Sequence, residues 1–210
     1  MSTRFAILAY EGIEPIDIGA TFGALSMAKR IAPDLTFFVI AREKGELEMT
    51  HGLRLVAQHG FADAPQAEIL MVLGGPGWEA ACQDAETLDF IRDRHGDGTT
   101  IASVCTGGMI LSAAGLLDGR QATTKREILP GEARPLDLLA ANPAIETREA
   151  RIVDEGDIVT GGGVSLGIDM TLFLLGRFCG SRVRDETMRI LEYDRAYHAN
   201  VAALPDLIRA

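Results

Sequence analysis

The segment "TTIASVCTGG" (Thr99–Gly108) joins two kinds of secondary structure. Its β-branched and small residues predict a buried strand that ends at a thiol, Cys105, and the apolar run "MILSAAGLL" that follows predicts a helix. A side chain at a sharp strand-to-helix turn projects out of the sheet, and the glycines after it let the helix start close to the strand. The segment therefore predicts an α/β fold with a nucleophile elbow at Cys105.

The remainder of the chain repeats this alternation of short apolar strands and helical segments. The sequence predicts strands at 4–10, 35–41, 67–75 and 119–124, hairpins at 45–60 and 150–163, and helices at 17–32, 84–96, 134–142, 165–180 and 184–199. Strands that alternate with helices form a mainly parallel sheet covered on both faces. We therefore expect a three-layer sandwich that forms one domain over residues 1–210.

Composition narrows the class of protein. The chain has 210 residues, 47% of them hydrophobic, and a formal net charge of −10. This charge disfavours nucleic acid as a partner, and no apolar run is long enough for a membrane span. The N-terminus lacks the pattern of a secretory signal, and three cysteines without metal-ligand spacing favour free thiols. We expect a soluble cytoplasmic protein that needs no metal and no cofactor and acts on a small molecule.

Functional groups in such a fold gather at the carboxyl ends of the strands. Glu14 and Asp17 follow the first predicted strand, and the turn "GGPG" (74–77) follows the third. A thiolate that attacks a carbon needs donors for the developing charge, and the backbone N–H groups of Thr106 and Gly75 are suitable. We also expect the start of the helix to lower the pKa of Cys105.

Each of these residues also has a purely structural interpretation. Asp17 suits an N-cap of the first helix, and Glu14, the rival carboxylate, suits a solvated loop. Trp78 either walls an apolar pocket or simply packs. Three further residues are expected to be structural. Cys82 and Cys179 are not at strand ends and suit small buried hydrophobes, whereas Asp169, inside an apolar helix, needs hydrogen-bond partners from the backbone or a neighbouring turn.

The motifs "GGPG", "SVCTGG", "ATT" and "VTGGGVSLGIDMTLFLL", in this order, resemble the ThiJ/PfpI superfamily, which shares its fold with class I glutamine amidotransferase domains. Within it, "IDIGATFGAL" and "SVCTGG" resemble the isocyanide hydratase branch. The resemblance implies a flavodoxin-like fold and a homodimer. It also implies that Cys105 is the reactive cysteine, Asp17 its acidic partner, Thr106 the residue after the nucleophile and Gly75 the oxyanion-type donor.

Two positions depart from the superfamily's pattern. Thr106 stands where protease and amidase members carry a histidine, and Lys125 stands where hydratase-like members often carry one. A Cys–His–Asp triad is therefore not expected, but a Cys–carboxylate pair remains. We expect a hydratase that forms a thioimidate on Cys105. The alternatives are redox sensing or a glyoxalase-like activity with the same thiol, or a non-catalytic module that senses small molecules.

Overall fold

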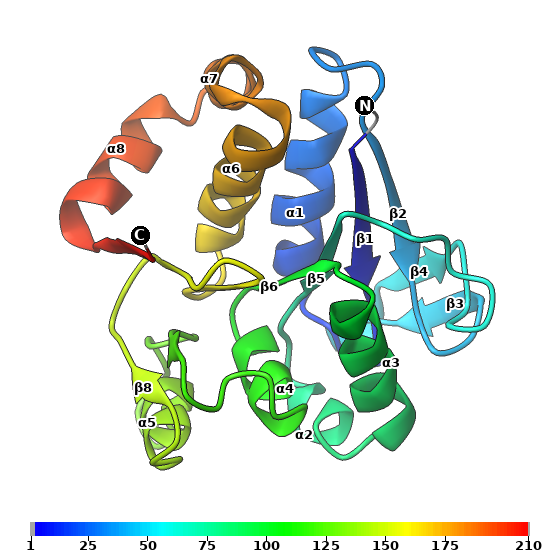
Figure 1. Ribbon diagram of the computed structural model, residues 1–210, viewed down its shortest axis with the longest axis vertical. Helices are drawn as coiled ribbons and strands as arrows, with labels where there is room; N and C mark the ends of the chain where they lie inside the picture. The colour runs from blue at the N-terminus through cyan, green and yellow to red at the C-terminus, as the bar shows by residue number, and fades with distance from the viewer. Residues whose placement is uncertain (1–2, 210) are drawn as a thin grey trace.

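A seven-stranded sheet forms the centre of the structure, a computed structural model that describes residues 3–209 (Figure 1). The strands of this sheet are β1 (Arg4–Leu8), β2 (Thr36–Ile40), β5 (Ile69–Val72), β6 (Thr100–Ser103), β9 (Ile152–Asp154), β10 (Ile158–Gly161) and β11 (Asp206–Ile208). Their order is β11-β9-β10-β6-β5-β1-β2. All pairs are parallel except β9 with β10. The mainly parallel sheet predicted from the sequence is confirmed.

Helices cover both faces of the sheet (Figure 1). One face carries α1 (Pro15–Ala28), α6 (Leu166–Cys179) and α7 (Ser181–Ile190), and the other carries α3 (Ala85–Gly96) and α4 (Gly107–Ala113). The shorter or peripheral elements are η1 (Thr50–Gly52), α2 (Trp78–Ala81), α5 (Pro135–Ala140), α8 (Asp194–Ala203) and two small sheets, β3 (Gly45–Glu48) with β4 (Arg54–Ala57) and β7 (Gln121–Ala122) with β8 (Glu146–Thr147). The three-layer α/β fold agrees with the sequence-based expectation.

Alternate residues of the central strands build two separate cores. In β1, Phe5 and Ile7 are buried against α1 and α6, whereas Ala6 and Leu8 are buried against α3 and α4. A parallel strand covered on both faces needs such a continuous apolar run, because its side chains point alternately to the two helical layers. This burial fixes the strand registers, and with them the loops at the carboxyl ends.

The predicted hairpins at 45–60 and 150–163 are confirmed as the antiparallel pairs β3–β4 and β9–β10. The prediction of one helix over 184–199 was wrong, because the structure has two helices, α7 and α8. Glu192, between them, has a φ of 54° and ends the first helix. The break lets Tyr193 turn inward, where its hydroxyl donates to Asp169 Oδ2 at 2.8 Å. Within the described residues, no helix is long and apolar enough to cross a membrane.

Candidate active site

Cys105 lies at a strained turn between β6 and α4. Its φ is 55°, in the left-handed region that non-glycine residues rarely adopt. Two hydrogen bonds hold this backbone: the Cys105 N–H donates to Gly162 O at 3.0 Å, and Thr124 Oγ1 donates to Cys105 O at 2.7 Å. Strain of this kind persists only where the surroundings hold it, and it is concentrated at functional sites. The structure therefore has the geometry of a nucleophile elbow.

Two glycines allow the loops around the elbow to approach closely. A Cβ added to Gly74, in the turn after β5, would lie 2.5 Å from Thr106 N and 2.8 Å from Cys105 Cβ. A Cβ added to Gly107 would lie 2.1 Å from Val72 O. Only glycine permits these contacts, since any side chain would push the helix start away from the sheet. The "GGPG" turn is thus in direct contact with the elbow.

Asp17 reaches the same place from the first turn of α1. Its side chain is fully buried, and its Oδ2 accepts the Gly74 N–H at 2.9 Å. Gly74 O in turn accepts the Glu14 N–H at 2.9 Å. The interpretation of Asp17 as the N-cap was wrong: Glu14 occupies the N-cap position, Pro15 begins the helix, and the Asp17 carboxyl points into the protein.

Cys105 and Asp17 form a coupled pair. Burial raises the pKa of Asp17 to about 7, although the Gly74 N–H and the Cys105 side chain both lower it. Burial, the larger cause, and the charge of Asp17 together raise the pKa of Cys105 to about 12. Asp17 Oδ1 is buried and has no conventional hydrogen-bond partner among residues 3–209, so the thiol is the neighbour that interacts with this carboxyl. At neutral pH the pair therefore carries at most one negative charge.

The expectation that the helix start lowers the pKa of Cys105 is not supported. The helix α4 has only seven residues, and Cys105 is 3% exposed, so loss of hydration outweighs the helix dipole. The backbone N–H groups of Val164 and Thr106 do act in the expected direction, and both lower the pKa of Cys105. These two N–H groups are the backbone donors that act on the sulfur.

The Gly75 N–H has a different partner from the predicted one. It donates to Thr106 Oγ1 at 3.0 Å, inside the protein. The hydroxyl of Thr106 therefore occupies the Gly75 N–H, which we had expected to stabilise negative charge developing on a substrate. The sequence missed Val164, which has a φ of 48° and presents its N–H from the loop after β10. The "GGG" motif at 161–163, just before it, was the available signal.

A cavity of about 540 Å³ opens onto Cys105. Apolar side chains supply most of its lining, together with one cation and three carboxylates. The lining residues are Glu14, Ile16, Gly75, Pro76, Trp78, Glu79, Cys105, Thr106, Lys125, Ile128, Glu132, Ala133, Pro135, Leu138 and Val164. Asp17 does not line the cavity and lies behind the thiol. A small, mainly apolar molecule fits this space, with Asp17 shielded from bulk water.

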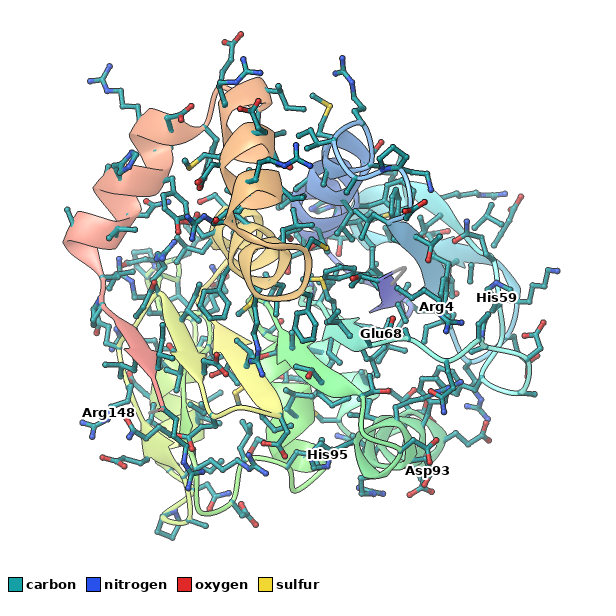
Figure 2. All side chains as sticks on the ribbon, turned by 45° about the horizontal axis from the view of Figure 1, so that its top comes forward. Arg4, His59, Glu68, Asp93, His95 and Arg148 are labelled. Carbon is teal, nitrogen blue, oxygen red and sulfur yellow. The ribbon has the colours of Figure 1, made fainter. Side chains whose placement is uncertain are left out.

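None of the described residues that line the cavity is a histidine. Figure 2 shows His59 and His95 on the periphery of the molecule. His95 Nε2 lies 2.7 Å from Asp157 Oδ2, and His59 packs edge-on against Phe38. The site therefore offers a cysteine, a buried carboxyl and backbone donors, and the histidine of a protease-type triad is missing from it.

Comparison with known proteins places this geometry in a family. Residues 3–176 match the DJ-1/PfpI family. The chain belongs to the DJ-1/PfpI family. The isonitrile hydratase of Pseudomonas putida is 31% identical over 92% of this chain and 79% of its own.

Two solved structures agree with this assignment. A ThiJ/PfpI family protein from Pseudomonas syringae has a TM-score of 0.77 and 31% identity, over 92% of this chain and 76% of its own. Drosophila melanogaster DJ-1beta has the same TM-score at 16% identity, over 91% of this chain and 98% of its own. The second likeness shows that the DJ-1/PfpI fold is retained when most of the sequence differs.

Proposed function

We propose that the protein is an isonitrile hydratase-like enzyme that adds water to a small electrophile through a covalent bond to Cys105. The observation that carries the proposal is the pair itself: a thiol at the bottom of a mainly apolar cavity, backed by a buried carboxyl whose pKa is raised to about 7. A carboxyl with a pKa near the working pH both accepts and returns a proton. The similarity to an isonitrile hydratase supports this choice of substrate.

The first step forms a thioimidate. The ionised Asp17 accepts the proton of the Cys105 thiol while the sulfur attacks the terminal carbon of R–N≡C. The neutral carboxyl then delivers this proton to the same carbon, which gives Cys105–S–CH=N–R. The N–H groups of Thr106 and Val164 stabilise the negative charge that develops on sulfur as the proton leaves, because both act on the thiol. The raised pKa of Cys105 fits this scheme, since the proton leaves only during the reaction.

The second step releases the product. Water adds to the C=N carbon while Asp17 takes a proton from the water and passes it to the nitrogen, which gives the tetrahedral adduct Cys105–S–CH(OH)–NH–R. The C–S bond then breaks as the C=O bond forms, Asp17 passes the hydroxyl proton to the leaving sulfur, and the product is the formamide R–NH–CHO. The sum of both steps is one isonitrile plus one water, and the enzyme returns to its starting state.

Redox sensing is a weaker use of the same thiol. Peroxide reacts with thiolates, and a thiol with a pKa of about 12 is protonated at neutral pH. The geometry thus favours proton-coupled attack on a bound electrophile over oxidation by peroxide.

Formamide formation tests the proposal. Purified protein is incubated with cyclohexyl and phenyl isocyanide, and the formamide is quantified by chromatography. We expect turnover by the wild type, none by Cys105→Ala, and close to full activity in Cys82→Ala, which removes another partly buried thiol. Equal rates in the wild type and Cys105→Ala would overturn the proposal, as would a wild type that forms no formamide.

A further inference from the structure

The cavity contains one cation, Lys125, among the described residues that line it. Its ammonium group makes no hydrogen bond or ion pair with any residue in 3–209. The neighbouring guanidinium groups of Arg126 and Arg134 do have a protein partner, because both bind Glu149 at 3.0 Å. An amine without a protein partner beside a reactive group is available to a ligand.

The position of Lys125 is fixed by its neighbours. Thr124, directly before it, binds the Cys105 carbonyl, and Lys125 O accepts the Leu136 N–H at 3.1 Å. Its stem packs on Gly163, where an added Cβ would lie 3.0 Å from Lys125 Cγ. The side chain therefore leaves the backbone between the elbow and the loop that presents Val164. Its charge is felt at both reacting groups, since it lowers the pKa of Cys105 and that of Asp17.

The three carboxylates that line the cavity, unlike Lys125, are not held between the elbow and the loop that presents Val164. Glu79 and Glu132 are exposed, and Glu132 already accepts the Leu129 N–H at 3.1 Å. Glu14 is half-buried at the start of α1. Among the charged side chains that line the cavity, the cation therefore acts at the thiol, and two of the three carboxylates are exposed to solvent. The carboxyl of Asp17 also acts on the thiol, but from behind it and outside the cavity. Opposite charges a few ångströms apart in a partly buried site attract strongly, and like charges at the entrance repel.

We propose that Lys125 makes this cavity select monoanionic electrophiles, in which a carboxylate lies within a few bonds of the carbon that Cys105 attacks. A molecule whose negative charge lies far from that carbon would place it among the acidic side chains and bind poorly. The inference deepens the proposed function, on which it rests for the reaction. Attraction of an anion to the thiol does not, however, require turnover.

Charge-selective alkylation tests the inference without an isonitrile. Iodoacetate and iodoacetamide both alkylate a thiol with loss of iodide, but only the first is an anion. We would measure, by peptide mass spectrometry, the rate of alkylation by iodoacetate divided by the rate with iodoacetamide at Cys105. The same ratio at Cys82 of the same sample is the internal reference. We expect the ratio at Cys105 to exceed that at Cys82 about tenfold. We expect Lys125→Met to remove this excess and Lys125→Arg to retain it.

A ratio at Cys105 that equals that at Cys82, or that is unchanged in Lys125→Met, would overturn the inference. Circular dichroism and an unchanged alkylation rate at Cys82 establish that Lys125→Met is folded. A second comparison uses isonitriles: isocyanoacetate should be hydrated with a higher kcat/KM than its methyl ester, and 6-isocyanohexanoate should lose this advantage. If no isonitrile is hydrated while alkylation still prefers the anion, the proposed function fails and the role of Lys125 stands.

Discussion

The Gly75 N–H donates a 3.0 Å hydrogen bond to Thr106 Oγ1, so the residue after Cys105 is held against the turn after β5. Thr106 is 5% exposed, so this hydrogen bond lies inside the protein. The contact fixes the spacing between the elbow and the "GGPG" turn. It also leaves the N–H groups of Thr106 and Val164 as the donors that face the thiol.

Replacing Thr106 tests this contact. Thr106→Val keeps the shape but leaves the buried Gly75 N–H without its acceptor, which costs about 1–3 kcal/mol. Thr106→Ser keeps the hydroxyl and should cost less than about 1 kcal/mol. The free energy of unfolding in urea measures both. Equal losses in the two variants would mean that the hydrogen bond does not hold the turn.

The raised pKa of Asp17 predicts how stability depends on pH. Below pH 3.8 the carboxyl is neutral in the folded and the unfolded state. As the pH rises from 3.8 to about 7, the unfolded state releases the proton and the folded state retains it, so stability falls over this window and then levels off. The pKa difference corresponds to about 4 kcal/mol.

Asp17→Asn removes this titration, because an amide does not ionise, and the amide oxygen can still accept the Gly74 N–H. Relative to the wild type, the variant should gain stability between pH 4.5 and 8, while formamide formation is lost. The free energy of unfolding in urea, measured for the variant and the wild type at pH 4.5 and at pH 8, gives the difference in stability at each pH. A stability difference between variant and wild type that stays constant with pH would contradict the raised pKa.

A second buried carboxyl, Asp169, serves the fold. Its Oδ1 binds Arg151 Nη1 at 2.9 Å, and the two side chains are 0% and 1% exposed. Tyr193 and Asn200 donate to its Oδ2 at 2.8 and 3.0 Å. The structural role predicted for Asp169 agrees with these contacts, and of the two expected kinds of partner, backbone or a neighbouring turn, the structure supplies Tyr193 from the turn between α7 and α8. The other partners are side chains from distant parts of the chain.

Arg151→Met should leave the buried Asp169 carboxylate without its cationic partner and lower the free energy of unfolding by about 3–5 kcal/mol. A matched control is Arg54→Met, at a pair with Glu46 in which the side chains are 70% and 65% exposed. It should cost less than about 1 kcal/mol. Similar losses in both variants would contradict a special role for the buried pair.

Gly74→Ala tests the close packing of the elbow. The new Cβ would lie within 2.5 Å of Thr106 N and must displace the helix start, so we expect a loss of about 2 kcal/mol or more and a large fall in kcat. Gly19→Ala in α1 is the control, because nothing lies within 4 Å of its Cβ position. It should stabilise the protein by about 1 kcal/mol. Thermal unfolding and formamide assays separate the two outcomes.

The strands, the hairpins and the elbow were predictable because their signals are local. The run 99–104 and the glycines after Cys105 specify a strand, a turn and a helix start within ten residues. The break at Glu192 was not predictable, since it depends on a hydrogen bond from Tyr193 to Asp169, on another helix.

The electrostatics of the site depended on contacts that are distant in the sequence. The Gly74 N–H that binds Asp17 comes from 57 residues away, and Val164 reaches the thiol only because β10 pairs with β6. The sequence indicated where Cys105 lies but not how deeply it is buried. Burial, and not the helix start, decides the direction in which the pKa of Cys105 changes.

The most direct measurement is detection of the covalent intermediate during turnover. The wild type is mixed with cyclohexyl isocyanide, quenched in acid within milliseconds to seconds and digested for peptide mass spectrometry. The account predicts a transient mass increase equal to one isonitrile on Cys105, which decays as formamide appears, with Cys82 and Cys179 unmodified. Formamide that accumulates with no adduct on Cys105, or with an adduct on another cysteine, would contradict it.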